Sequence, residues 1–191
     1  TPLHSSAASD VYKRQLSVRS THIDSSHLHM MPPFTFLLPT DGIESSRINK
    51  THQITVYCPQ GWTPATQLKQ VGSDIGINSI IGNNSDKYDY TAPDRDELLD
   101  GIIEANSNPN ISFEVDGRRH ILKLWDSGGY PTSETMINRF IGDMEKIITE
   151  HHALFGIPDW GDYITIIHLT EKSRGGLEHL NSQTSMLPRI C

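Results

Sequence analysis

Short runs of alternating hydrophobic and polar residues dominate the region from residue 34 to residue 126. Residues 52–57 alternate in this way and place Ile54 and Val56 on one face, as a half-buried β-strand does. Clusters of Gly, Pro, Asn and Asp separate the runs, which is typical of turns between strands. We therefore expect an all-β unit in this part of the chain.

The sequence predicts one β-hairpin within that region. Its strands are residues 111–115 and 120–125, and they flank Asp116-Gly117, a dipeptide that tolerates the positive φ angles of a type I′ turn. Residues 86–104 differ from it, because they carry seven acidic residues against two basic ones. We expect a solvated acidic loop there, with a helical turn at residues 96–99. The spacing of the acidic residues does not match a calcium-binding loop.

The hydrophobic period changes to that of a helix after the glycines at 128 and 129. Thr132 or Ser133 can cap the start, and Gly156 with Pro158 ends the helix. The apolar positions form one stripe, which we interpret as core packing: Met136, Ile137, Phe140, Ile141, Met144, Ile147 and Ile148. Residues 162–169 then predict a buried strand and residues 171–174 a polar turn, so the expected fold class is mainly β with one long helix (α+β).

Composition and charge exclude several classes of function. The 191 residues suffice for one medium domain, or a small domain with part of another. A net charge of -7, with 16 basic and 23 acidic residues, and scattered basic residues argue against nucleic-acid binding. No apolar run approaches the length of a membrane span. We expect a soluble protein, and the sequence leaves a cytoplasmic, periplasmic or secreted location open.

Both ends of the chain are unusual. Residues 1–15 resemble translated adapter sequence, so we treat them as a non-native segment outside the fold. The last residues, 186–191, lack the composition of a helix end or a tail. We therefore expect the chain to be a fragment of a longer protein.

Ten histidines raise the possibility of a metal site. No His-Glu-x-x-His is present, and Cys58 and Cys191 have no zinc-site spacing. His151 and His152 fall in the last helical turn, where they suit the helix dipole, and residues 22–29 with their three histidines read as a polar loop. No Gly-x-Ser-x-Gly elbow supports a serine triad. We expect no catalytic residues and no metal ligands in this chain.

A combination of motifs near the C-terminus is more specific. Residues 175–182 read Gly-Gly-Leu-Glu-His-Leu-Asn-Ser, after a Phe-Gly-Ile-Pro loop at 155–158 and the strand that begins at Tyr163. Together with Pro-Gln-Gly-Trp at 59–62, these motifs resemble the glycyl aminopeptidase family of PDZ-containing, thermolysin-like zinc metallopeptidases. The resemblance covers roughly residues 34–185 and departs at Gly101-Ile102, where the family usually has Ser-Pro.

The resemblance implies a domain division. It predicts a β-sandwich-like N-terminal domain over residues 16–129 and the truncated start of a thermolysin-like catalytic domain over residues 130–191. It also implies zinc in the full-length protein, and none in this fragment, which should be inactive alone. The expected partners are the N-terminus of a peptide substrate and the remainder of the catalytic domain.

The same resemblance implies a substrate site on an edge strand. Glu178 would hold the free α-ammonium group of a peptide, while the paired glycines let its backbone approach closely. The predicted substrate-binding residues are Gly175, Gly176, Leu177, Glu178 and His179. For His179, a structural hydrogen bond is an equally good expectation.

Two alternatives remain open from the sequence. One is a stand-alone β-rich module that binds peptides or glycans on its strand edges without catalysis. The other is a secreted structural domain, which rests only on three Asn-x-Ser/Thr sequons at Asn49, Asn83 and Asn110.

Overall fold

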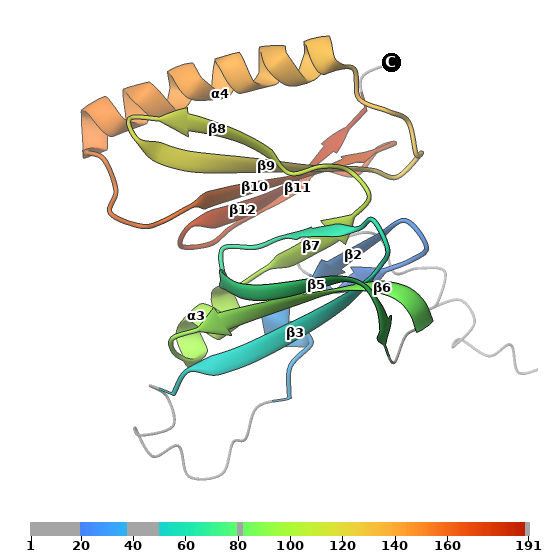
Figure 1. The fold of residues 1–191 in the computed structure, drawn as a ribbon. Coiled ribbons are helices and arrows are strands. Elements are labelled where there is room, and N and C mark those ends of the chain that lie inside the picture. Colours follow the sequence, from blue (N-terminus) through green and yellow to red (C-terminus); the bar gives the residue numbers. More distant parts are fainter. Residues whose placement is uncertain (1–19, 38–49, 80–81, 190–191) are drawn as a thin grey trace, which may run out of the picture.

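The computed structural model describes residues 20–37, 50–79 and 82–189 and arranges them in four layers (Figure 1). Three β-sheets are stacked, and one long helix covers the outer face of the last sheet. A three-stranded sheet consists of β3 (His52–Pro59), β6 (Gly82–Ala92) and β5 (Lys69–Ser79). A four-stranded sheet, the middle sheet, consists of β1 (His22–Ile23), β2 (His27–Met30), β7 (Ile103–Asn106) and β4 (Thr63–Ala65). Residues 1–19 lie outside the described part, and they include the whole adapter-like segment at residues 1–15, which was expected not to belong to the fold.

The first two sheets pack face to face, which supports the predicted mainly β fold. Ile54 and Val56 of β3 point into the core between them, as their alternation predicts. Ile103 and Ala105 of the middle sheet meet them from the other side. The strands in both sheets are antiparallel. Burial of one face of each strand therefore explains the period-two pattern.

The third sheet, the C-terminal sheet, has five strands. In spatial order they are β11 (Gly175–Glu178), β12 (Ser182–Pro188), β10 (Tyr163–Thr170), β9 (Arg118–Asp126) and β8 (Ile111–Val115). β10 is parallel to both neighbours, whereas β8 and β11 are antiparallel edge strands. The hairpin prediction is confirmed, with positive φ angles of 50° at Asp116 and 73° at Gly117.

This sheet contains residues from both sides of the predicted domain boundary at 129. β9 pairs with β10 from Tyr163↔His120 to Leu169↔Asp126. The hairpin assigned to the N-terminal domain is therefore hydrogen-bonded to the segment assigned to the catalytic domain. β12 was not anticipated, and residues 177–182, expected as one strand, bend between β11 and β12.

The predicted long helix is α4 (Glu134–Phe155), which lies over β8 and β9 (Figure 1). Ser133 caps it by accepting a hydrogen bond from the Met136 amide at 3.2 Å, and Gly156 ends it with a φ of 88°. Its apolar stripe is only partly buried, so the expected core packing is incomplete: Met136 and Ile147 are exposed, whereas the other five members are half-buried. The reason is geometric, because α4 lies along one face of the sheet, most closely over β8, and its opposite side faces away from the sheet.

The acidic segment is the clearest error of the sequence prediction. Only its helical turn is confirmed, as α3 (Arg95–Asp100). Its first part belongs to β6 and its last part to β7, where Glu104 is fully buried. The number of acidic residues suggested solvent exposure. In residues 103–106, however, apolar and polar side chains alternate on a strand that is buried on both faces. No helix of the described chain is long and apolar enough to cross a membrane.

Candidate functional site

The predicted substrate strand β11 lies at an edge of the C-terminal sheet. Among the described residues it pairs only with β12, so its other edge is open. Leu177 packs into the core between the middle and C-terminal sheets, whereas Gly176 and Glu178 point to the opposite face. A Cβ built at Gly176 would lie 3.5 Å from Glu178 Oε1, so the carboxylate reaches back over the bare backbone of that glycine.

The surroundings of Glu178 leave its carboxylate available. The side chain is exposed, and none of the described residues forms a hydrogen bond or ion pair with it. Burial raises the pKa of Tyr163 on β10, and the negative charge of Glu178 adds to that effect. The phenol is therefore protonated beside the carboxylate. The strand thus presents a charged group next to open backbone.

His179 has a structural partner at the end of β11. Its Nδ1 lies 2.8 Å from Asp100 Oδ1, and the Leu180 amide donates to Asp100 Oδ2 at 3.0 Å. Gln67 Nε2 also donates to Asp100 Oδ2, at 2.8 Å. Burial alone would raise the pKa of Asp100, but the hydrogen bonds from His179 and Leu180 lower it below its usual value. An ionised Asp100 therefore ties the end of the candidate strand to the N-terminal layers.

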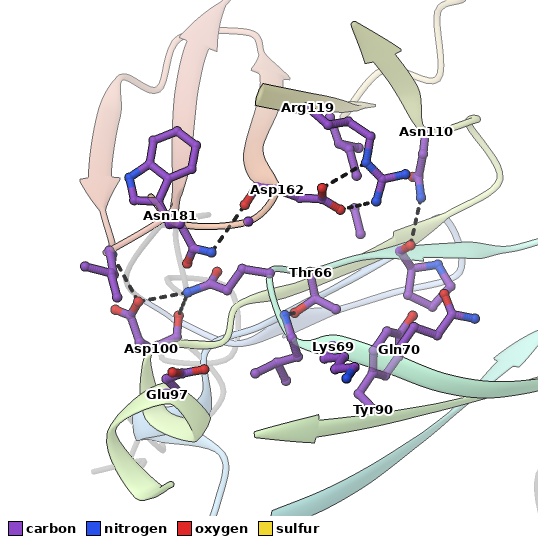
Figure 2. A pocket seen from close by; sticks show the side chains of 18 of the residues that line it. Thr66, Lys69, Gln70, Tyr90, Glu97, Asp100, Asn110, Arg119, Asp162 and Asn181 are labelled. Atoms are coloured by element: carbon purple, nitrogen blue, oxygen red, sulfur yellow. Dashed lines mark hydrogen bonds and ion pairs between the residues drawn. The ribbon is translucent and has the colours of Figure 1, made fainter. Parts of the chain in front are cut away.

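A cavity of about 1030 Å³ adjoins this anchor (Figure 2). Leu180 and Asn181 line it on the β11 side, and Arg119 lines it from β9, where its guanidinium is paired with Asp162. Four carboxylates from the α3 region also line it: Asp94, Asp96, Glu97 and Asp100. Glu178 is not among the lining residues. No sequence motif marked this cavity, because its walls come from segments more than 100 residues apart.

A second polar cluster lies between the middle and C-terminal sheets. Three imidazole nitrogens surround Glu104: His27 Nδ1 at 3.0 Å, His29 Nδ1 at 3.1 Å and His168 Nε2 at 2.9 Å. Asn106 Nδ2 donates to Oε1 at 3.1 Å. All five side chains are buried. We call this group the Glu104 junction.

The protonation states in the junction follow from this geometry. Burial would raise the pKa of Glu104, but the hydrogen bonds from His168, His27 and His29 hold it well below its usual range. A carboxylate only accepts, so each imidazole nitrogen that faces it carries a proton. Burial lowers the pKa of His168, against the attraction of Glu104, so its ring is neutral near pH 7.

The predicted polar loop at residues 22–29 is wrong. His22 lies in β1, and His27 and His29 lie in β2, where both are fully buried. In the sequence His-Leu-His-Met, alternation places both histidines on the face toward the C-terminal sheet. Leu28 and Met30 then face the other core. His152 lies in the last turn of α4, as predicted, and its Nδ1 also lies 2.8 Å from Asp116 Oδ2.

Two groups of described residues have ligand atoms close enough to hold a metal ion. They are His22, Asp24 and His27, and His27, Glu104 and His168. Linear spacing did not reveal them, because their members come from different strands. Neither group includes a residue of β11. The described residues therefore do not fit a zinc ion beside Glu178.

Comparisons with known proteins agree with the fold. The family model described as Peptidase M61 N-terminal domain matches residues 5–105. Its end lies in β7, so the match covers the first two sheets, and its start lies within the adapter-like segment. No curated protein matches the chain significantly in sequence.

Solved structures extend the similarity into the C-terminal sheet. An aminopeptidase N family protein from Idiomarina loihiensis matches 92% of this chain with 21% identity and a TM-score of 0.73. An M1 zinc metallopeptidase from Deinococcus radiodurans matches 88% with 14% identity and a TM-score of 0.50. A mutant two-domain M1 zinc metallopeptidase with bound L-arginine matches 88% with 13% identity and a TM-score of 0.53.

These similarities show a shared fold. They also show the extent of the chain: it spans 27% of the Idiomarina protein and 37% of each of the two M1 metallopeptidases. Most of the length of each relative therefore has no counterpart here.

Proposed function

Because the chain belongs to the Peptidase M61 N-terminal domain family, we propose that it is the N-terminal portion of a zinc-dependent aminopeptidase, which removes N-terminal residues from peptides. The observation that carries this proposal is the open edge of β11 with the exposed Glu178 beside it. The finer assignment, a PDZ-containing glycyl aminopeptidase, rests on the sequence motifs at 59–62, 155–158 and 175–182 together with the strand from Tyr163.

The chemistry of β11 suits a peptide with a free N-terminus. An extended peptide would add to the open edge through backbone hydrogen bonds. The Glu178 carboxylate would then accept from the peptide's α-ammonium, a charge-assisted contact that contributes about 1.5–3 kcal/mol. Gly175 and Gly176 keep side chains off this path. Such a contact favours terminal over internal peptide bonds.

Hydrolysis itself would need groups outside this chain. A bound zinc ion polarises the scissile carbonyl and lowers the pKa of a water molecule, and its usual His-Glu-x-x-His ligands are absent from the sequence. We therefore expect the chain alone to bind but not to cleave. The remainder of the catalytic domain would cover the exposed part of the α4 stripe.

Peptide binding by the chain tests this proposal directly. We would titrate a tripeptide and its N-acetylated form into the isotope-labelled chain and follow the amide resonances of β11 and β12 by NMR. Weak binding of the free tripeptide at β11, lost on acetylation, is expected. Glu178→Gln should abolish the difference, whereas Glu171→Gln, in the exposed turn before β11, should not. Equal binding of both peptides by the unaltered chain would contradict the role of Glu178.

The cavity next to Asp100 favours a second candidate function. A site of about 1030 Å³ between strands and α3 is large enough for several peptide or sugar residues. In a stand-alone binding module, ligand contacts would fall on cavity residues such as Glu97 and Asn110, not on β11. The NMR titration separates the two, because resonance shifts would then map to the cavity and persist in Glu178→Gln.

A further inference from the structure

The β1–β2 hairpin presents a group of side chains that the proposed function does not use. β1 and β2 pair in the register His22↔His29 and Ile23↔Leu28, so His22 and His27 lie diagonally on one face. Asp24 begins the turn between the strands. The three ligand atoms, one from each of His22, Asp24 and His27, lie within 4.8 Å of one another.

The Glu104 junction determines which nitrogen of His27 is free. Glu104 Oε1 accepts from His27 Nδ1 at 3.0 Å, which places the proton of the neutral ring on Nδ1. The other nitrogen, Nε2, then carries a lone pair that points out of the junction, and in the absence of an ion it accepts a hydrogen bond from His22 Nδ1 at 2.6 Å. A histidine that binds a metal ion usually donates its other ring N–H to a carboxylate in this way, which fixes the orientation of the ring.

Packing holds His27 in this orientation. The ring of Trp125 stacks on it with centroids 3.6 Å apart and an angle of 8° between the planes. Trp125 Nε1 also donates to Ser26 Oγ at 3.0 Å, so the hairpin turn is tied to the same tryptophan. The ligand nitrogen is therefore preorganised by groups from the middle and C-terminal sheets.

The other two members of the group are accessible and have suitable charge. Asp24 is exposed, so its carboxylate is open to solvent. Its Oδ1 holds the turn, by accepting from the Ser26 amide at 2.6 Å, and Oδ2 has no such role in the described structure. His22 is half-buried, and its ring centroid lies 4.8 Å from that of His27.

The inner group of His27, Glu104 and His168 is a weaker candidate. Four donors already occupy the Glu104 carboxylate, and all of its members are buried, so an ion would have neither a free oxygen nor a route of entry. The hairpin group has both. Glu104 therefore acts through His27 and not as a ligand.

We propose that His22, Asp24 and His27 form a binding site for a divalent transition-metal ion such as Zn²⁺. Two imidazoles and one carboxylate match the ligand preference of Zn²⁺, whereas Ca²⁺ and Mg²⁺ require more oxygen ligands. Tetrahedral zinc places two ligand nitrogens about 3.3 Å apart, so His22 must move by less than about 1 Å. Water would complete the coordination. The proposal departs from the expectation, drawn from linear spacing, that the chain has no metal ligands.

Cobalt titration of the chain tests this site without any activity assay. The chain would be produced without a histidine tag, stripped with a chelator and titrated with Co²⁺ at neutral pH. We expect saturable visible absorption at one ion per chain, with quenching of tryptophan fluorescence through Trp125, and displacement by Zn²⁺. Acidification should weaken binding, because both imidazoles must be deprotonated.

Substitutions assign the site. His22→Ala should weaken the affinity at least about tenfold, and Asp24→Asn by a similar or smaller factor. His151→Ala, in the exposed last turn of α4, is the matched control and should bind as the unaltered chain does. His22 and Asp24 lie at the surface, so circular dichroism should show folded variants. Absence of a one-to-one complex, or equal affinity in both hairpin variants and the control, would overturn the proposal.

Discussion

Two glutamates in this protein, Glu104 and Glu178, occupy opposite environments. Glu104 lies between two sheets, is fully buried and accepts four hydrogen bonds. Glu178 lies on an edge strand, is exposed, and has no hydrogen-bond partner among the described residues. The Glu104 carboxylate holds the sheets together through its hydrogen bonds, whereas the Glu178 carboxylate remains free to bind a ligand. The difference teaches that charge in the sequence does not indicate a role until the environment is known.

Substitution of each glutamate by glutamine should give the largest contrast. Glu104→Gln removes a buried charge and places an amide against imidazole N–H groups, so we expect a loss of about 3–5 kcal/mol in the free energy of unfolding. Glu178→Gln is the matched control and should change it by less than about 0.5 kcal/mol. Urea unfolding followed by circular dichroism measures both. Equal effects would show that the Glu104 junction does not stabilise the fold.

Lowering the pH should destabilise the Glu104 junction before it affects the edge strand β11. Burial lowers the pKa of His168 from 6.5 in the folded chain. Below that pH the unfolded chain therefore binds a proton that the folded chain does not bind, and the free energy of unfolding falls. The pKa of Glu104 is also lowered, from 4.5, by its hydrogen bonds, so its contribution is lost as pH falls further. We expect the urea midpoint to fall steadily from pH 7 to pH 4.

A variant can assign part of this pH dependence to the junction. His168→Gln keeps a donor toward Glu104 but does not titrate, so the slope between about pH 6.5 and pH 5 should become shallower. It should not vanish, since burial also lowers the pKa of His22 and His120. An unchanged slope would locate the acid sensitivity elsewhere.

The smallest expected effect is local, at the anchor of β11. Asp100→Asn should weaken the contacts to His179 and Leu180, at a cost of about 1 kcal/mol. The Leu180 amide should then exchange faster with solvent, as should β11, while β10 stays protected. Hydrogen exchange measured by NMR detects this change. Asp96→Asn, on the exposed side of α3, is the control, and identical exchange in both variants would remove Asp100 from its anchoring role.

The sequence predicted the elements that carry a local signal. The hairpin at Asp116-Gly117, the capped helix from Ser133 and the strand from Tyr163 are all confirmed. Backbone preferences and capping hydrogen bonds act within a few residues, so they can be read along the chain. The edge position of β11 also agrees with the resemblance, although the role of Glu178 there stays a prediction.

Two of the errors, in residues 22–29 and 86–104, have a cause in common. Residues 22–29 and 86–104 were read as solvated because they are rich in His, Asp and Glu. The middle sheet is covered on both sides, so its polar residues are buried and satisfy one another across layers. A polar residue is ordinarily exposed, and only partners distant in sequence reverse that expectation.

Local sequence patterns predicted several of the strands, the long helix, the turn residues and the Gly-Gly-Leu-Glu-His motif, since each depends on neighbours along the chain. Only the tertiary structure decided that Glu104 meets three histidines, that Asp100 anchors His179, and that His22, Asp24 and His27 share one face. These contacts join residues up to 79 positions apart, as with Asp100 and His179. Their energies depend on burial and distance, which the packing of the sheets creates and no linear pattern contains.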